Sequence, residues 1–540
     1  MPTIPIRQLG KIGVITDVNA VDLPPEAVSS ARNVRFSNGN ITNAHVWREA
    51  IASPSGTTPV LLFQGERTNT YDILGYITKN GSVYHVANGV TDDVSIGGYV
   101  PSDSTAQRSF CTMQGVYYVN QEDRVPWYFK STSTDYATLT NWDVNHRCKV
   151  LRSYKDFLIA LNITKSGTSY KNMVKWSDIA QYDSVPSSWD PADLTKSAGE
   201  NTVGEIQNDL MDGLTLRNSF ILYSPTQAWS MEYTQGSDVF QFFKLYGDRG
   251  IVGTNCVVEV DGSHFVFDDD DIYVNDGVSP PKSLCDKRVR NHIFRNIDLT
   301  KASSFFVYHE KPASEVWFCF NSRALGLKWS AADCNYCNYA AVYNYGEDTW
   351  TFHDLPNVTS MTYVSWQIGR QYSTSSSFTY DALGSSYVDM ISNNTKNTFA
   401  ASISTTGVAT TRIVNVDAGI NSSLPFNSVS ELAVTPYVER VGLDLDEVVP
   451  ELRAYKNYRS VYPQVTVSDT SAPLSFKFGG VDMPQQAIEW DSLQSFEATT
   501  DYKIDTRSRG RYLSWYFEGA NNNSYTLSGF DLDCVSLSRR

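Results

Sequence analysis

The sequence predicts an all-β protein: a β-propeller of six to eight blades with a second β domain built from both chain termini. Aromatic residues are abundant, with 32 Tyr, 25 Phe and 12 Trp in 540 residues. Apolar strand-like runs alternate with short turns, and almost no helical periodicity extends beyond two turns. Aromatic and β-branched runs separated by turn residues are typical of strands. The centres of these runs lie roughly 40–60 residues apart, which is the length of one four-stranded blade.

We assign residues 1–55 to the N-terminal segment of the second, platform-like β domain. The stretch LPPEAVSSARNVRF, residues 23–36, predicts a short helix because Pro24 and Pro25 suit a first helical turn. The strand that follows reaches an Asn38-Gly39 pair, which is typical of a tight hairpin turn.

Residues 56–430 form the predicted propeller. Each repeating unit is a strand, a turn with Gly, Asn or Asp, and a strand ending in Trp or Tyr. The clearest units are YDILGYITKNGSVYHVANG, RSFCTMQGVYYVNQEDRVPWYF, LRNSFILYSPTQAWSMEY and AAVYNYGEDTWTF. A seventh, weaker unit lies in 361–425, and the Ser/Thr/Asn-rich part at 370–430 is either a long surface excursion or a poorly packed blade. A set of antiparallel sandwiches is the alternative to a propeller.

Residues 431–540 form the C-terminal part of the platform-like domain, and they contain the stretch DYKIDTRSRGRYLSWYF. Arg507, Arg509 and Arg511 share a parity, so an extended chain directs them to one side. The acidic residues before them lie on the same parity. The pattern therefore favours an ion-paired sheet face or a subunit contact over a phosphate grip.

The stretch FDDDDIYVNDG carries the densest acidic run. Its carboxylates are Asp268, Asp269, Asp270, Asp271 and Asp276. Hard oxygen ligands suit Ca²⁺, but the spacing is not that of an EF-hand loop, and consecutive side chains diverge. We therefore expect a solvated acidic turn with no bound metal.

No catalytic motif is legible, and we expect no catalytic residues, no cofactor and no enzyme activity. The sequence has no G-x-S-x-G, H-E-x-x-H or Walker loop. A glycosidase on a propeller needs paired carboxylates, and no local signature marks such a pair. His264 lies within a strand pattern and is expected to be packed. Cys334 and Cys337 form one C-x-x-C, which we interpret as structural thiols because a zinc site needs a second pair nearby.

The formal net charge of −15 argues against tight wrapping of nucleic acid, because phosphate contacts need Lys and Arg. No run of about 18 apolar residues exists, so we expect no membrane-spanning helix. The first residues lack an apolar segment with a cleavage site, so we expect no signal peptide.

Several segments carry a family resemblance. DLPPEAVSSARNVRFSNGNI near the start and YKIDTRSRGRYLSWYF with YTLSGFDLDCVSLSRR near the end resemble the tail nozzle proteins of short-tailed bacteriophages. These are also called tail tubular protein B or tail stabilisation proteins. VLRSYKDFLIALNI, NMVKWSD and FKLYGDRGIVGTNCVVEVDGSHFVFDDDDIYVNDG fit the same group in order. The resemblance extends to about residue 355 and resumes in the C-terminal domain, and its motifs are structural.

The resemblance implies a structural virion protein, assembled in the host cytoplasm, that forms a homohexameric ring in the tail. The ring would sit below the portal and its adaptor, continue and gate the DNA-ejection channel, and offer docking surfaces for tail fibres or spikes. Viral DNA would pass without sequence-specific binding. The five aspartates of the acidic run are then candidates for the channel or its rim, where carboxylates repel phosphate. Screening limits that repulsion to about 8 Å, so the gate itself must be steric. The alternative function is a receptor-binding or carbohydrate-binding propeller of a virion.

Overall fold

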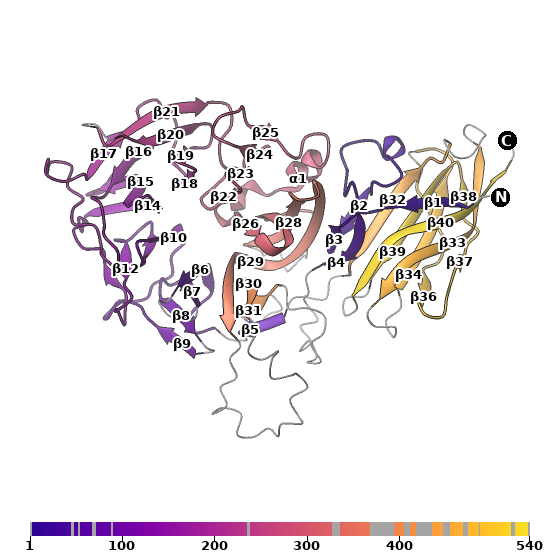
Figure 1. Cartoon of the computed structure of the whole chain (residues 1–540), viewed down its shortest axis with the longest axis horizontal. Helices are drawn as coiled ribbons and strands as arrows, with labels where there is room; N and C mark the ends of the chain where they lie inside the picture. Colours follow the sequence, from indigo (N-terminus) through magenta and orange to yellow (C-terminus); the bar gives the residue numbers. More distant parts are fainter. Residues whose placement is uncertain are drawn as a thin grey trace, which may run out of the picture.

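The structure is a computed structural model, and it places a ring of β-sheets beside a second β domain (Figure 1). The described residues are 3–44, 48–51, 54–66, 72–87, 90–234, 238–326, 335–367, 394–403, 411–416, 435–446, 454–467, 474–484, 486–519 and 524–537. None of the helices in these ranges is long and apolar enough to cross a membrane. The predicted fold class is confirmed: sheets dominate, and both termini lie in the second domain.

Five four-stranded antiparallel sheets, here called blades 1 to 5, follow one another along the chain. Blade 1 is β6 (Pro59–Glu66), β7 (Asp72–Thr78), β8 (Val83–Ala87) and β9 (Val90–Asp93). Blade 2 is β10 (Arg108–Met113), β11 (Val116–Gln121), β12 (Trp127–Phe129) and β13 (Ala137–Thr138). Blade 3 is β14 (His146–Tyr154), β15 (Phe157–Lys165), β16 (Thr168–Trp176) and β17 (Gly199–Thr202). Blade 4 is β18 (Asp212–Leu216), β19 (Ser219–Tyr223), β20 (Ala228–Tyr233) and β21 (Phe240–Tyr246). Blade 5 is β22 (Val257–Val260), β23 (Ser263–Phe267), β24 (Ile272–Asn275) and β25 (Lys282–Ser283).

The ring is completed by a seven-stranded sheet that contains two blades sharing one strand. Its strands in order are β26 (Phe306–Glu310), β27 (Glu315–Phe320), β28 (Cys337–Asn344), β29 (Thr349–Gln367), β30 (Asn394–Ile403), β31 (Thr411–Asn415) and β5 (Arg48–Ile51). The first part of β29 pairs with β28, and the part after Asn357, whose φ is +55°, pairs with β30. Blade 6 is therefore β26 to β29, and blade 7 is β29, β30, β31 and β5.

The strands of blade 7 do not agree with the predicted domain boundary at residue 55. Residues 48–51 were assigned to the second domain, but β5 pairs with β31 and is the last strand of the propeller. The first strand of blade 7 is tied to blade 1, because Thr359 Oγ1 donates to Pro59 O at 2.9 Å. In addition, Leu62 N donates to Ser360 Oγ at 3.2 Å. An N-terminal strand thus closes the ring.

The second domain consists of two antiparallel sheets. One contains β3 (Val34–Ser37), β4 (Asn40–Asn43), β40 (Tyr525–Leu537), β33 (Tyr455–Val467) and β37 (Ile504–Asp505), with β1 (Ile4–Arg7) on β40 and β38 (Arg509–Gly510) on β33. The other contains β2 (Ser30–Arg32), β32 (Tyr437–Leu443), β39 (Tyr512–Glu518), β34 (Leu474–Val481) and β35 (Glu489–Trp490), with β36 (Gln494–Phe496) on β34. Aromatic rings join the two sheets: Trp515 of β39 lies 5.0 Å from Phe530 of β40, centroid to centroid. The domain is a sandwich to which neither terminus alone supplies all the strands.

The helix predicted at 23–36 is wrong. A 3-10 turn spans Ala20–Asp22, and the strands β2 and β3 occupy the later part of the stretch. The tight turn at Asn38-Gly39 does form, with φ of +51° and +72°. Elsewhere, α1 (Arg290–Asn296) and the 3-10 segments Leu299–Ser304 and Lys311–Ala313 connect or follow blade strands.

The two domains meet where the N-terminal segment runs along β29. Val14 N donates to Trp350 O at 3.1 Å, and Asn33 N donates to Phe352 O at 2.9 Å. Unpaired strand edges expose backbone groups, and this segment covers the outer edge of blade 6. An ion pair reinforces the joint, since Arg35 Nε lies 2.7 Å from Oε1 of the buried Glu315.

The Arg35–Glu315 pair yields a stability prediction. Arg35→Leu leaves the Glu315 carboxylate buried without that guanidinium, so we expect the free energy of unfolding to fall by about 3 kcal/mol. The matched control is Arg7→Leu, whose partner Asp531 lies in a more exposed pair that is expected to contribute less than about 1 kcal/mol. Chemical denaturation of both variants measures the difference, and equal losses would contradict the proposed importance of the joint.

Candidate functional site

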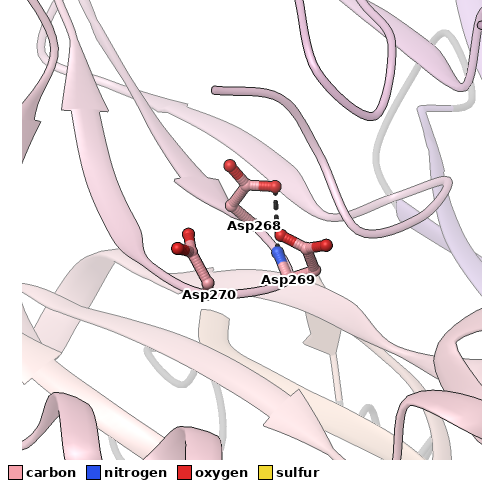
Figure 2. Close-up of side chains that lie close together, drawn as sticks. All are labelled: Asp268, Asp269 and Asp270. Carbon is pink, nitrogen blue, oxygen red and sulfur yellow. Dashed lines mark hydrogen bonds between the residues drawn. The ribbon is translucent and has the colours of Figure 1, made fainter. Parts of the chain in front are cut away.

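The acidic run of the sequence forms the turn between β23 and β24 of blade 5. Phe267 pairs with Ile272, and Asp268 N donates to Asp271 O at 2.9 Å. Figure 2 shows the first three aspartates of this turn, whose carboxylate oxygens come within 4.8 Å of one another. Asp268 is buried, whereas Asp269 and Asp270 are exposed.

Asp268 stabilises the turn through backbone amides. One carboxylate oxygen accepts from Gly250 N and the other from Asp269 N, both at 2.9 Å. Burial raises the pKa of Asp268 to about 6, although these two amides oppose the rise. Gly250 lies in the connection from blade 4 to blade 5, so this carboxylate holds the turn against the start of its own blade.

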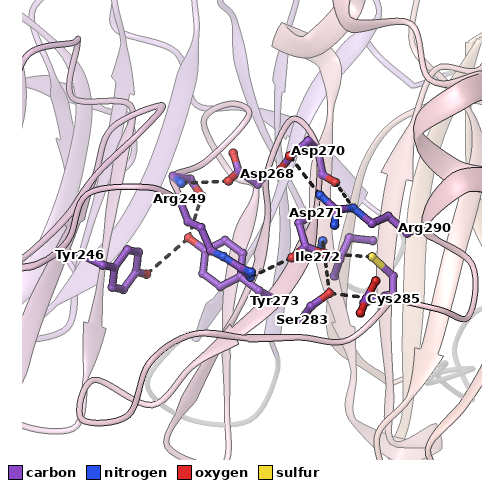
Figure 3. Close-up of polar contacts among 12 residues, drawn as sticks. Tyr246, Arg249, Asp268, Asp270, Asp271, Ile272, Tyr273, Ser283, Cys285 and Arg290 are labelled. Atoms are coloured by element: carbon purple, nitrogen blue, oxygen red, sulfur yellow. Dashed lines mark hydrogen bonds and ion pairs between the residues drawn. The ribbon is translucent and has the colours of Figure 1, made fainter.

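Asp271 is the centre of a buried polar network (Figure 3). Its Oδ2 accepts from Arg249 Nη1 at 2.8 Å, and its Oδ1 accepts from Ser283 Oγ at 2.6 Å and Ile272 N at 2.9 Å. The Cys285 thiol also contacts Oδ1, at 3.1 Å. The network joins three segments of blade 5 around one carboxylate.

These positions correct the prediction of a solvated turn in which all five aspartates could face a channel or its rim. Asp268 and Asp271 are buried because backbone amides and Arg249 bind their carboxylates. Asp270 is exposed and pairs with Arg290 at 3.1 Å. Asp276 accepts from the amides of two following residues, and these hydrogen bonds lower its pKa. Only Asp269, Asp270 and Asp276 remain candidates for an acidic surface.

The arginine stretch lies at the edge of the second domain. Arg507 and Arg509 are exposed and alternate with buried Thr506 and Ser508, as the parity predicted. The predicted ion pairs within the sheet do not form for these two arginines among the described residues. The reason is that Asp505 binds Lys503 at 2.9 Å instead. Arg511 is half-buried, and its carbonyl accepts from Lys456 Nζ at 3.1 Å. A subunit contact through this edge stays a prediction.

His264 is buried between blade 4 and blade 5. Its Nδ1 lies 2.9 Å from Tyr223 Oη and its Nε2 lies 3.0 Å from Thr215 O. Burial lowers the pKa of His264 to about 4. The ring is therefore a neutral structural group. Cys337 is buried, and all seven described cysteines are free; Cys334 lies outside the described residues.

The sequence reasoning missed a polar belt that joins the inner strands of the propeller. Arg152 of blade 3 binds the buried Asp212 of blade 4 through two contacts, of 2.9 and 2.8 Å. The same guanidinium reaches Phe110 O of blade 2 and Asn255 Oδ1 at the start of blade 5. The four groups come from blades separated by up to about 150 residues, so no local pattern marks them.

A cavity of about 770 Å³ lies along the propeller axis beside this belt. The first strand of every blade contributes to its wall. One such residue from each of blades 1 to 7 in turn is Leu61, Arg108, Arg152, Leu214, Val258, Phe306 and Ser360. In the described residues, seven blades thus surround one axis.

Comparisons with known proteins give no family. No family model matches the chain, and no curated protein matches it. Among solved structures, the chain is similar to the computationally designed Ika8 protein at 10% identity, with a TM-score of 0.35, covering 68% of this chain and 100% of that one. It is similar to a chain of the Mitotic Checkpoint Complex at 10% identity, with a TM-score of 0.36, covering 58% and 88%. It is also similar to YCF48 from Cyanidioschyzon merolae at 8% identity, with a TM-score of 0.34, covering 69% and 98%. Similarities this weak carry no functional argument.

The Asp271 network predicts unequal effects within one acidic turn. Asp271→Asn removes the negative charge beside Arg249 and places an amide NH2 group next to hydrogen-bond donors. We therefore expect the free energy of unfolding to fall by about 3 kcal/mol. Asp270→Asn is the matched control, and its exposed pair with Arg290 is expected to contribute less than about 1 kcal/mol. Thermal unfolding of both variants measures this difference in the free energy of unfolding. A larger effect at Asp270 would indicate that the turn is held by its surface charges.

The buried His264 predicts a pH dependence of stability. Its folded pKa lies below the unfolded value near 6.5, so the unfolded state binds more protons as the pH falls from about 6.5 to 4. Acidification through this window therefore destabilises the fold, by on the order of 3 kcal/mol from this residue. His264→Gln removes the titration, and we expect a shallower loss of stability between pH 6.5 and 4 than in the unmodified protein. Identical slopes would show that the histidine is already protonated in the folded state.

Proposed function

We propose that this chain is a structural protein of a short bacteriophage tail, where copies of it form the ring-shaped nozzle that continues the DNA-ejection channel. The observation that carries the proposal is the sequence resemblance of the terminal segments to tail nozzle proteins, and the architecture, a propeller joined to a domain that holds both termini, is compatible with it. The partners are further copies of the chain, the portal adaptor, and tail fibres or spikes.

The joint between the domains supports a role as a rigid building block. Backbone pairing along β29 and the Arg35–Glu315 ion pair fix the N-terminal segment on blade 6. A ring that transmits DNA under pressure needs subunits whose two domains do not shift against each other. The exposed edge that carries Arg507 and Arg509 is then available for a neighbouring subunit.

The charge of the chain supports passage of DNA without sticking. A net charge of −15 disfavours phosphate contacts, and DNA carries about one negative charge per 1.7 Å of helix axis. Asp269, Asp270 and Asp276 are the acidic side chains of the predicted set that remain at the surface. In this function the chain has no catalytic role, and the gate acts by steric closure.

The second candidate function is a receptor- or carbohydrate-binding propeller of a virion. The axial cavity of about 770 Å³ favours it, because small-molecule sites commonly have this size. However, none of the residues that line this cavity belongs to the terminal segments that carry the sequence resemblance. We therefore rank it second.

Assembly of the purified chain tests the proposed function. Light scattering and negative-stain images are expected to show a closed ring of six copies with an axial channel, and antibodies are expected to label the tail of the virion. Arg509→Ala is expected to raise the concentration needed for assembly by about tenfold or more, as for a central interface arginine. Arg323→Ala, an exposed arginine of the propeller, is the control. A chain that stays monomeric, or a label at the tips of fibres, would contradict the nozzle function.

A further inference from the structure

The axial cavity has a basic end. Its lining includes four cations, Lys79, Arg108, Arg152 and Lys301, and one carboxylate, Glu259. Arg152 is neutralised by Asp212, and Lys79 pairs with Asp103 at 3.0 Å. The other two cations have no carboxylate partner within 4 Å among the described residues.

Arg108 is the more unusual of these two cations. Its side chain is buried, with 7% of the residue exposed, and its guanidinium donates to the carbonyls of Ala106, Lys79 and Ser104. Its Nε has no hydrogen-bond partner. Burial has the larger effect and lowers the pKa of Arg108, although Asp123 and Asp103 favour its charge from a distance. A buried charge without a direct ion-pair partner is costly, and a bound anion would compensate it.

Lys301 lies at the same end of the cavity. It is half-buried in the connection to blade 6, and its ammonium donates to Asn335 Oδ1 at 2.5 Å. Gln107, next to Arg108, donates to Ser303 O at 3.1 Å, so the two connections meet across the axis. Tyr336 lines the same end, and the positive charges of Lys79 and Arg108 oppose the rise that burial gives its pKa. Its hydroxyl makes no hydrogen bond with the described residues.

Beyond the basic end, the wall combines apolar side chains with uncharged polar ones such as Asn255, Thr359 and Ser360. Leu61, Leu214, Val258, Phe306 and Met361 come from five different blades and line the cavity beyond the basic end. Glu259 is exposed and accepts from Gly262 N at 2.7 Å in the turn that follows β22. The charge of the cavity is thus unevenly distributed, with cations at one end and hydrocarbon beside them.

We propose that this cavity binds a small organic anion, whose carboxylate or phosphate group lies between Arg108 and Lys301 and whose apolar part packs against Phe306 and its neighbours. The volume is within the range of small-molecule sites. The Lys301 ammonium and the Tyr336 hydroxyl are the hydrogen-bond donors that line this end of the cavity, and the Arg108 guanidinium beside them supplies positive charge. The site lies within one chain, so it does not depend on the proposed ring.

The test uses 8-anilinonaphthalene-1-sulfonate, a fluorescent aromatic anion, with the full-length protein. We expect one probe molecule to bind per chain. Lys301→Met is expected to raise the dissociation constant about tenfold or more, because hydrogen bonds between charged groups are stronger than those between neutral groups. N-phenyl-1-naphthylamine, the uncharged counterpart, is expected to bind with unchanged affinity. Lys171→Met is the control, because Lys171 is an exposed lysine that pairs with Asp209 and does not line the cavity.

Arg108→Met is the second variant, and its unfolding curve is recorded first because three carbonyls depend on the guanidinium. Lys301→Met leaves the buried hydrogen bonds intact, so it decides the outcome if Arg108→Met does not fold. Displacement of the probe by inorganic phosphate supports a phosphate-bearing ligand, and displacement by acetate supports a carboxylate. The proposal is overturned if Lys301→Met binds the anionic probe as tightly as the unmodified protein, or if neither competitor displaces it.

Discussion

The last blade of the propeller is completed by a short strand that comes from the N-terminal segment of the other domain. β5 pairs with β31 and supplies the last strand of blade 7, although the remaining propeller strands begin only at Pro59. The preceding strands, β3 and β4, belong to the second domain, where β1 pairs with β40 from the far end of the chain. Blade 7 therefore takes its outermost strand from the N-terminal segment, while its first strand contacts blade 1. Pairings across such sequence separations carry a high loop-closure cost and favour slow folding.

The same segment also covers the edge at which the propeller would otherwise expose backbone groups. Val14 and Asn33 donate backbone hydrogen bonds to the outer part of β29, and Arg440 of β32 binds the carbonyls of Ala20 and Leu23 between them. Burial lowers the pKa of Arg440 to about 10. Lys456, also buried, binds Asp446 at 2.6 Å. A hydrogen-bonded arginine thus lies where the two ends of the chain meet, and a buried ion pair lies within the C-terminal segment itself.

The sequence allowed the strands and the ring to be predicted, because alternation, turns and aromatic strand ends are local signals. The helix at 23–36 failed since tertiary pairing overrides local propensity: Val28 forms a parallel bridge with Val14, and Ser30–Arg32 pairs with β32. The acidic turn was located correctly, but the burial of Asp271 depends on Arg249, which lies on another strand connection. The axial cavity could not be predicted, because its cations come from separate blades and meet only through the closure of the ring.

Hydrogen exchange of the intact protein tests the closure of the ring most directly. If β5 is an integral strand of blade 7, the amides of Arg48–Ile51 that pair with β31 exchange slowly and become accessible together with Thr411–Asn415 as denaturant is added. Fast exchange at residues 48–51, with full protection of β31 and the rest of the propeller, would contradict closure by this strand.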